Sequence, residues 1–221
     1  MTNHVVGANL LRLKKEIVPY TPRIIAVTKY YDANAIIEAY DAGLRDFGES
    51  RANDAIKKIE SLPEKIRKES FFHFIGHLQT NKVDKVVKYF DYIQSVDSYH
   101  LANAISESAE KFGKVQKVLI QVNISGEVQK FGFDIEKLKN CICELKQLPN
   151  LDIIGLMCMA PFEADEKTLN SVFSEAKNLK DELNSAYGMN LTELSMGMSD
   201  DYGCAVKNGA TMIRIGRLLF N

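Results

Sequence analysis

The sequence predicts an α/β fold, a single (β/α)8 TIM barrel with an extra N-terminal helix. Eight short apolar or β-branched segments alternate with segments whose apolar residues have helical spacing. This alternation implies parallel strands joined by right-handed crossovers. With 221 residues there is no room for a sizeable second domain, so we expect residues 1–221 to form one domain. A doubly wound open sheet is the alternative.

The extra helix is expected from Asn9 to Val18, where apolar residues recur at helical spacing before Pro19 and Pro22 end the pattern. Eight runs rich in β-branched, aromatic or other apolar residues are the expected strands: Arg23–Thr28, Asp46–Gly48, Phe71–Ile75, Tyr92–Val96, Val115–Ile124, Leu151–Met159, Glu193–Met196 and Met212–Ile215.

Seven segments with helical spacing follow these runs: Asn34–Ala42, Arg51–Ser61, Asn81–Tyr89, Tyr99–Phe112, Ile135–Leu148, Lys167–Tyr187 and Asp201–Asn208. The helix after the last strand is missing, or its place is taken by the N-terminal one.

The composition is that of a soluble globular protein, with 46% hydrophobic and 26% charged residues. The 28 basic and 29 acidic residues give a net charge of −1, which argues against a dedicated nucleic-acid binder. Lys82, Lys85 and Lys88 are expected on a solvated helix face. No apolar run approaches the roughly 18 residues of a membrane span, and residues 1–9 lack a secretory pattern. We therefore expect a cytoplasmic protein without nucleic-acid or membrane partners.

The cysteines and histidines form no metal-binding pattern. No CxxC or HExxH occurs, and Cys141 and Cys143 lie two apart in a predicted helix, on different faces. We expect four buried, reduced thiols and no metal site.

Two basic residues interrupt strands that should be apolar. Lys29 follows the first strand on the face of Ile25 and Val27, so its amine either reaches solvent or lies desolvated and suited to Schiff-base formation. Arg214 lies between two isoleucines that are expected to point outward. An inward guanidinium needs an acidic side chain or a ligand as its partner.

Polar turns follow the last two strands. Gly197 and Ser199 precede a short helix expected to begin at Ser199 or Asp200, where free N–H groups could bind an anion, although Ser199 could be an ordinary N-cap. Gly216 follows the eighth strand. In (β/α)8 barrels the loops after strands seven and eight commonly bind phosphate. Strand eight neighbours strand one, so lysine, arginine and glycine turns would surround one mouth, suited to pyridoxal 5′-phosphate (PLP).

Gln121 and Asn123 share one face of the fifth strand. They could form a satisfied core network or part of this pocket.

The sequence resembles the pyridoxal-phosphate homeostasis protein family, PLP-binding proteins related to the barrel domain of alanine racemase. The resemblance covers nearly the whole chain and is carried by AVTK (26–29), FGES (47–50), HFIGHLQTNK (73–82), QVNIS (121–125), GLM (155–157), LSMGMSDD (194–201) and RIG (214–216).

The resemblance implies that Lys29 forms the Schiff base with PLP and that Arg214 faces the pyridine nitrogen. Ser199 and backbone groups near Gly216 and Arg217 would hold the phosphate. The remaining cofactor-binding residues that we expect are Ser50, Ile75 and Met196, and we assign no catalytic residue. The implied function is to carry or buffer PLP and to support PLP and amino-acid or keto-acid homeostasis.

An amino-acid racemase is the alternative function. Arg214 cannot accept a proton, so an arginine at the pyridine nitrogen weakens carbanion stabilisation. Alanine racemase also uses a tyrosine from a separate C-terminal domain of the partner subunit, for which this chain is too short. We therefore expect a non-catalytic monomer whose partners are PLP and apo forms of PLP-dependent enzymes.

Three positions depart from the family pattern. Ser50 stands where asparagine is usual, Phe131 where serine is common, and Arg217 where threonine or serine is usual. Arg217 could replace the missing hydroxyl with a charge-assisted contact or point away from the phosphate.

Overall fold

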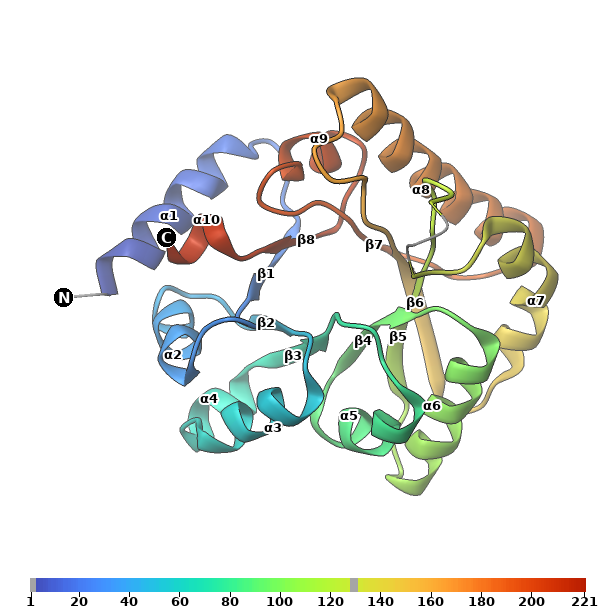
Figure 1. Cartoon of the computed structure of the whole chain (residues 1–221), viewed down its shortest axis with the longest axis horizontal. Helices are drawn as coiled ribbons and strands as arrows, with labels where there is room; N and C mark the ends of the chain where they lie inside the picture. The colour runs from blue at the N-terminus through green and yellow to red at the C-terminus, as the bar shows by residue number, and fades with distance from the viewer. Residues whose placement is uncertain (1–2, 128–130) are drawn as a thin grey trace.

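Eight parallel strands close into a barrel in chain order, and helices surround it, in the computed structural model of the chain (Figure 1). The structure describes residues 3–127 and 131–221. Strand β1 pairs with both β2 and β8, so the sheet has no free edge at this point. The predicted (β/α)8 barrel is confirmed, and the open sheet was the wrong alternative.

The strands fall at the predicted places. They are β1 (Arg23–Val27), β2 (Asp46–Glu49), β3 (Phe71–Phe74), β4 (Tyr92–Val96), β5 (Gln116–Gln121), β6 (Leu151–Met157), β7 (Glu193–Ser195) and β8 (Met212–Ile215). Strand β5 ends earlier than its apolar pattern predicts, because the chain beyond it turns into a loop that makes one bridge, from Val122 to Phe133.

The helices are α1 (Asn3–Glu16), α2 (Ala33–Asp41), α3 (Ala52–Ser61), α4 (Glu64–Glu69), the short 3₁₀ helix η1 (Thr80–Lys82), α5 (Val83–Tyr89), α6 (Tyr99–Lys111), α7 (Ile135–Gln147), α8 (Glu166–Tyr187), α9 (Tyr202–Lys207) and α10 (Arg217–Phe220). Helix α4 was not predicted, since Ile66 is its one buried residue and it carries no apolar stripe.

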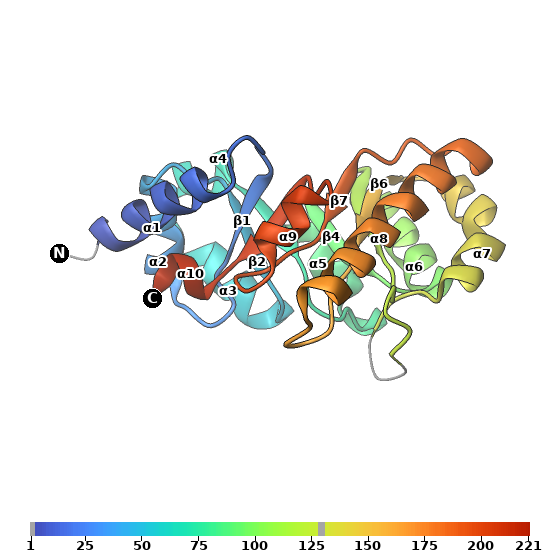
Figure 2. The same ribbon diagram turned by 90° about the horizontal axis from the view of Figure 1, so that it is seen from above.

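The N-terminal helix lies where a full eighth helix would otherwise cover the barrel. Helix α10 has only four residues, and α1 lies beside it (Figures 1 and 2). The Asn9 amide donates a hydrogen bond of 3.1 Å to the carbonyl of Leu219. Leu10 and Leu13, on the inner face of α1, are buried. The predicted extra N-terminal helix is therefore confirmed, although it begins earlier than its apolar pattern indicates.

Two separate apolar layers show which way each strand residue points. Ile213 and Ile215 belong to the large core between the strands and the helices, whereas Met212 belongs to a small cluster inside the barrel. Since side chains alternate along a strand, Arg214 shares the inner face with Met212. The predicted inward direction of Arg214 is confirmed.

A charged cluster fills the interior at the N-terminal ends of β1 and β2. His73 Nε2 lies 2.9 Å from Asp46 Oδ1, and Arg23 Nη1 lies 3.6 Å from the same oxygen and 3.0 Å from the Tyr92 hydroxyl. The His73 ring stacks on Tyr92 at a centroid distance of 4.3 Å and is 0% exposed. Burial lowers the pKa of His73, although its hydrogen bond to Asp46 acts in the opposite direction.

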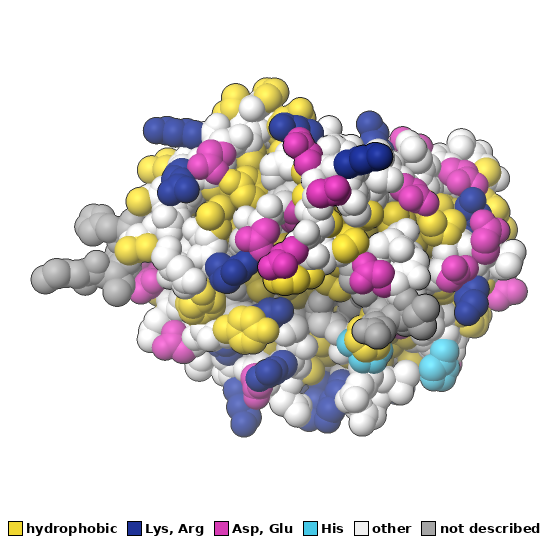
Figure 3. Space-filling model, turned by 45° about the horizontal axis from the view of Figure 1, so that its top comes forward, with side chains coloured by type: hydrophobic (Ala, Val, Ile, Leu, Met, Phe, Trp, Pro, Cys, Tyr) yellow, Lys and Arg dark blue, Asp and Glu magenta, His cyan; other side chains and the backbone are white. Residues whose placement is uncertain are grey.

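The distribution of charged side chains on the surface and the apolar character of the helices were also predicted from the sequence. On the face shown in Figure 3, basic and acidic side chains are interspersed. Lys85 and Lys88 are exposed, on a helix whose buried residues are valines, whereas Lys82 is half-buried and belongs to η1. In the part of the chain that the structure describes, no helix combines the length and apolar character that a membrane crossing needs.

The thiols only partly follow expectation. Of the four thiols expected to be buried, Cys158 is buried, Cys141 and Cys204 are half-buried and Cys143 is exposed. Cys143 is exposed because α7 turns Leu138, Ile142 and Leu145 toward the core and Cys143 away from it. Residues 3–127 and 131–221 contain no group of three His, Cys, Asp or Glu side chains arranged to hold a metal ion.

We predict that Gly155→Ala destabilises the fold by more than about 2 kcal/mol. A Cβ at this position would lie 2.0 Å from the Glu193 carbonyl oxygen on the paired strand, so β6 and β7 would have to separate. Urea unfolding measures the effect. Gly7→Ala in α1 is the control: apart from the neighbouring backbone of α1, no atom lies within 4 Å of its added Cβ, and it should be neutral or stabilising by up to about 1 kcal/mol. Equal stability of the two variants would contradict the prediction.

We also predict a pH dependence of stability that originates from His73. Its pKa in the folded protein is lowered from 6.5, so below about pH 6.5 the unfolded chain binds a proton that the folded protein does not. The free energy of unfolding should therefore fall as the pH decreases from 7 toward 5, by at most about 1.4 kcal/mol per pH unit from this residue. His73→Gln should lack this component, and equal slopes for both proteins would exclude it.

Candidate functional site

A cavity of about 590 Å³, which we call the main cavity, opens at the C-terminal ends of the barrel strands. Its volume lies within the roughly 300–1,000 Å³ range of small-molecule sites, and its position is that of active sites in (β/α)8 barrels. It is lined by Val27, Lys29, Tyr30, Tyr31, Ile75, Met157, Met159, Phe162, Met198, Ser199, Asp200, Arg214, Gly216 and Arg217.

The structure brings together most of the residues singled out in the sequence. The residues in this cavity are Lys29, Ile75, Ser199, Arg214, Gly216 and Arg217. Ser50 instead lines a neighbouring cavity of about 300 Å³, and its carbonyl oxygen would lie 2.3 Å from a Cβ at Gly76. Met196 is fully buried in the outer apolar core. Ser50 and Met196 therefore lie outside the set of side chains that face the cavity.

Lys29 lies just past the end of β1 and is half-buried. Its ammonium is 4.9 Å from the centroid of the Tyr30 ring, and Tyr30 is itself 76% exposed. The amine therefore has an arrangement between the two expected from the sequence, since it lines the cavity and also borders solvent. An amine in this position can attack the carbonyl of a ligand held in the cavity.

A buried ionic cluster anchors the residue before Lys29. Glu49, which is 2% exposed at the end of β2, accepts a hydrogen bond of 2.7 Å from the Thr28 hydroxyl and pairs with Lys58. Lys58 Nζ also donates to the Thr28 carbonyl at 2.7 Å. This support was not predicted from the sequence, although a glutamate that ends an apolar strand and a lysine in the helical segment that follows were the available signal.

Arg214 is buried, and although Asp201 acts on it electrostatically, its hydrogen bonds go to neutral acceptors. Nη1 donates to Ser195 Oγ at 2.8 Å and Nη2 to the Cys158 carbonyl at 2.9 Å, and no carboxylate of the described residues forms an ion pair with it. Burial lowers the pKa of Arg214 and raises that of the Cys158 thiol to about 12. A guanidinium facing a cavity beside neutral acceptors favours a ligand with a hydrogen-bond acceptor.

The turn after β7 has a backbone that only glycine fits. Gly197 has a φ of +91°, and a Cβ there would lie 2.6 Å from the Cβ of Ala205. Helix α9 begins at Tyr202, so the expected helix start at Ser199 or Asp200 was wrong, and Ser199 is not its N-cap. The turn extends as far as Asp201, because the Asp201 carboxylate accepts a hydrogen bond from the backbone N–H of Met198.

Gly216 behaves differently from Gly197. Its φ of −113° lies outside the left-handed region, and an added Cβ would make ordinary contacts of 3.4 Å or more with Val27. The fold alone would accept a side chain at Gly216. The glycine instead preserves room in the cavity that it lines.

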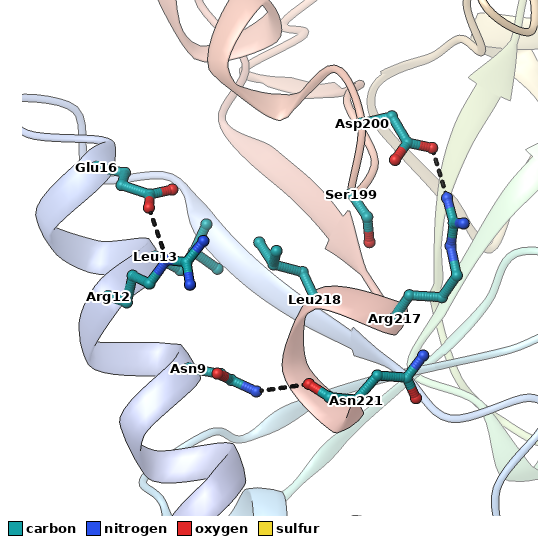
Figure 4. Close-up of a pocket in the computed structure, with 9 residues that line it drawn as sticks. All are labelled: Asn9, Arg12, Leu13, Glu16, Ser199, Asp200, Arg217, Leu218 and Asn221. Atoms are coloured by element: carbon teal, nitrogen blue, oxygen red, sulfur yellow. Dashed lines mark hydrogen bonds and ion pairs between the residues drawn. The ribbon is translucent and has the colours of Figure 1, made fainter.

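Arg217 forms an exposed ion pair with Asp200, with 2.6 Å between Nη2 and Oδ2 (Figure 4). The two residues line both the main cavity and a second one of about 330 Å³ between the turn and helices α1 and α10. Ser199 also borders both cavities. Arg217 thus lies at the site with its charge directed to Asp200, beside the Ser199 hydroxyl.

Gln121 and Asn123 belong to a satisfied network. Gln121 donates to the Phe131 carbonyl at 3.1 Å, and Asn123 donates to the Glu127 carbonyl at 2.8 Å. Both amides therefore hold the loop after β5 and do not line the main cavity.

Comparison with known proteins identifies relatives along the whole chain. Residues 5–221 match the family model for the alanine racemase N-terminal domain. The pyridoxal phosphate homeostasis protein of Synechocystis is 42% identical over 203 residues, which cover 92% of each chain.

Solved structures agree. PipY of Synechococcus elongatus without PLP has a TM-score of 0.92 at 39% identity, covering 98% of this chain and 100% of PipY, and PipY with PLP bound has a TM-score of 0.89 at 38% identity over the same shares. Alanine racemase of Clostridium difficile shares the fold, with a TM-score of 0.81 at 16% identity over 97% of this chain and 56% of the racemase. The chain belongs to the alanine racemase N-terminal domain family and, within it, to the pyridoxal phosphate homeostasis proteins.

Proposed function

We propose that this protein binds PLP reversibly through Lys29 and carries or buffers it in the cytoplasm, as a single-domain monomer that supplies apo forms of PLP-dependent enzymes. The observation that carries the proposal is the convergence in one cavity of Lys29, Arg214 and the two phosphate-binding candidates, Ser199 and Arg217. Each matches a different part of PLP: the aldehyde, the ring nitrogen and the phosphate. PipY, a close structural relative, has PLP bound in one of its structures.

When bound, the aldehyde of PLP supplies a carbon that condenses with a primary amine, with release of one water molecule. Lys29 is the primary amine that lines the cavity, and the Glu49–Lys58–Thr28 cluster fixes its backbone. Tyr30 contacts the ammonium but is mostly exposed, so it can leave without disturbing the core. Lys29 must lose its proton to solvent before it can attack, and its half-exposed position permits this.

The phosphate would lie between the two glycine turns. Ser199 offers a hydroxyl, Gly216 leaves space, and Arg217 offers a guanidinium that can exchange Asp200 for a phosphate oxygen. An exposed ion pair contributes only about 0–1 kcal/mol, whereas Arg–phosphate contacts are charge-assisted and often bidentate. Arg217 thereby compensates for the hydroxyl residue usual at this position.

The ring would lie against apolar walls with its nitrogen toward Arg214. Val27, Ile75 and Met157 provide these walls. Arg214 can only donate a hydrogen bond, so it favours an unprotonated ring nitrogen, which withdraws fewer electrons than a protonated one. This supports carriage over amino-acid racemisation.

Release to another protein is supported by the open mouth. Tyr30 and Phe162 line the cavity and are 76% and 84% exposed. The groups proposed to bind PLP line one cavity of a single chain. A second subunit is not needed to complete the site.

Lys29→Ala should abolish covalent retention of PLP. After incubation with PLP and borohydride reduction, the wild type should carry one added pyridoxyl phosphate on the peptide containing Lys29, detected by mass spectrometry, and should lose its visible absorbance band. The variant should show neither the added mass nor the band. Lys68→Ala on α4, whose side chain is 73% exposed, is the control and should behave as wild type. An adduct of wild-type yield in Lys29→Ala would refute the assignment.

The same preparations separate a carrier from a racemase. Incubation of PLP-loaded wild type with amino acids in heavy water should give no α-hydrogen exchange above that of free PLP. Exchange at enzymatic rates would establish the racemase instead.

The two members of the Arg217–Asp200 pair should have opposite effects on PLP affinity. Arg217→Ala removes a phosphate donor and should weaken binding roughly tenfold. Asp200→Asn removes the carboxylate that competes for Arg217 and should strengthen binding by a few-fold. Titration at low and high salt measures both, and the difference should shrink at high salt. Changes in the same direction would show that Arg217 does not contact the phosphate.

A further inference from the structure

A chain of buried polar side chains crosses the barrel from Arg214 to Asp46. Arg214 Nη1 donates to Ser195 Oγ at 2.8 Å, and Ser195 Oγ lies 2.6 Å from Gln94 Oε1. Gln94 Nε2 lies 3.0 Å from His73 Nδ1, and His73 Nε2 lies 2.9 Å from Asp46 Oδ1. The chain therefore links the candidate site to the charged cluster at the opposite end of the barrel.

The middle of this chain is fully removed from solvent. Ser195, Gln94 and His73 are each 0% exposed. Strands β4 and β7 are not neighbours in the barrel, so the Gln94–Ser195 hydrogen bond spans the interior. A barrel interior normally contains branched apolar residues, and these polar groups are tolerated only because each has a partner.

The donor-only character of Arg214 fixes the direction of every bond. Ser195 must accept from Arg214, so its own hydrogen is donated to the carbonyl oxygen of Gln94. The Gln94 amide then donates to His73 Nδ1, which must be unprotonated. His73 consequently carries its hydrogen on Nε2 and donates it to Asp46. All four hydrogen bonds run one way, away from the cavity.

The other tautomer of His73, with its hydrogen on Nδ1, is unfavourable. Protonation of His73 at Nδ1 would require the Gln94 amide to turn over, and the Ser195 hydroxyl hydrogen would then lose its buried acceptor, at a cost of roughly 1–3 kcal/mol. The charged and titratable groups around the imidazole are Asp46, Arg23, Asp91 and Tyr92. Arg23 opposes a positive charge on the ring, while Asp46 is satisfied by the Nε2 hydrogen.

We propose that Ser195, Gln94 and His73 are positioning residues, which hold the Arg214 guanidinium in the orientation that donates a hydrogen bond to the ring nitrogen of PLP. This inference rests on the proposed function for the identity of the ligand. Without the chain, the Cys158 carbonyl would be the one hydrogen-bond acceptor left to Arg214 among the described residues, and the guanidinium could rotate about that hydrogen bond. The chain thus determines recognition of the ring nitrogen from a distance.

The first test uses the full-length protein without ligand. Nitrogen-15 NMR of the imidazole groups at pH 7 should show His73, assigned with His73→Gln, as a neutral ring with its hydrogen on Nε2. Ser195→Ala should convert it to a mixture of tautomers, because Gln94 is then free to turn over. Ser195→Thr retains the hydroxyl and should preserve the tautomer. Ser95→Ala is the matched control, since this serine adjoins Gln94, is 1% exposed and has a hydroxyl without a partner.

The second test measures affinity for PLP against 1-deaza-pyridoxal 5′-phosphate, which has C–H in place of the ring nitrogen. The wild type and Ser95→Ala should prefer PLP roughly tenfold. Ser195→Ala should lose this preference while still forming the adduct on Lys29, and Ser195→Thr should restore it. Gln94→Met, which breaks the chain at its next member, should lose it as well if Ser195→Ala does not fold.

The outcomes separate the two proposals. A hydrogen on Nδ1 of His73, a tautomer unaffected by Ser195→Ala, or an unchanged preference for PLP in folded Ser195→Ala or Gln94→Met would overturn the positioning role. Absence of a Lys29 adduct in the wild type would instead overturn the proposed function, while the ligand-free spectra would still decide whether the chain couples Arg214 to His73.

Discussion

The burial of one guanidinium that is hydrogen-bonded to neutral oxygens determines much of this structure. Arg214 lies inside the barrel, 4% exposed, and its hydrogen bonds go to neutral oxygens. Moving a charge out of water costs several kcal/mol unless hydrogen bonds compensate for it. A carboxylate would provide that compensation but would also neutralise the group that faces the cavity. Neutral acceptors keep Arg214 in place and leave its charge available.

The same constraint explains why the barrel interior is not uniformly apolar. Because Ser195 accepts a hydrogen bond from Arg214, the Ser195 hydroxyl hydrogen needs a buried acceptor, which Gln94 provides. Gln94 and His73 each need a further acceptor in turn, and the Asp46 carboxylate ends the chain. Around this path the interior remains apolar, with Ile25, Leu119, Met157 and Met212 in contact. Hydrogen bonds therefore connect the charged cluster at the N-terminal ends of the strands with the proposed binding site at their C-terminal ends.

The sequence predicted the architecture well because it depends on local patterns. Alternating apolar runs and helical spacing located all eight strands, and period-two alternation placed Arg214 inside the barrel. The short helix α4 was missed because a single buried residue, Ile66, leaves no periodic signal. The helix start near Ser199 was wrong because it depends on the Asp201–Met198 hydrogen bond. The pairing of Gln94 with Ser195, 101 positions apart, could not be predicted because it depends on the closed barrel bringing together strands that do not touch in the sheet.

The proposed reversible carriage of PLP would place opposite demands on the two ends of the ligand, and the exposure of the residues follows those demands. The group assigned to the ring nitrogen, Arg214, is buried and held by hydrogen bonds to Ser195 and Cys158, which would provide selectivity. The groups assigned to the aldehyde and the phosphate, Lys29 and Arg217, are half-buried and exposed, and each has a weak exposed partner, Tyr30 and Asp200. Because exposed pairs form and break at little cost, these partners can take back Lys29 and Arg217 when the ligand leaves. An enzyme that retains its cofactor through many turnovers has no need for such replacements, whereas a carrier that must release PLP does.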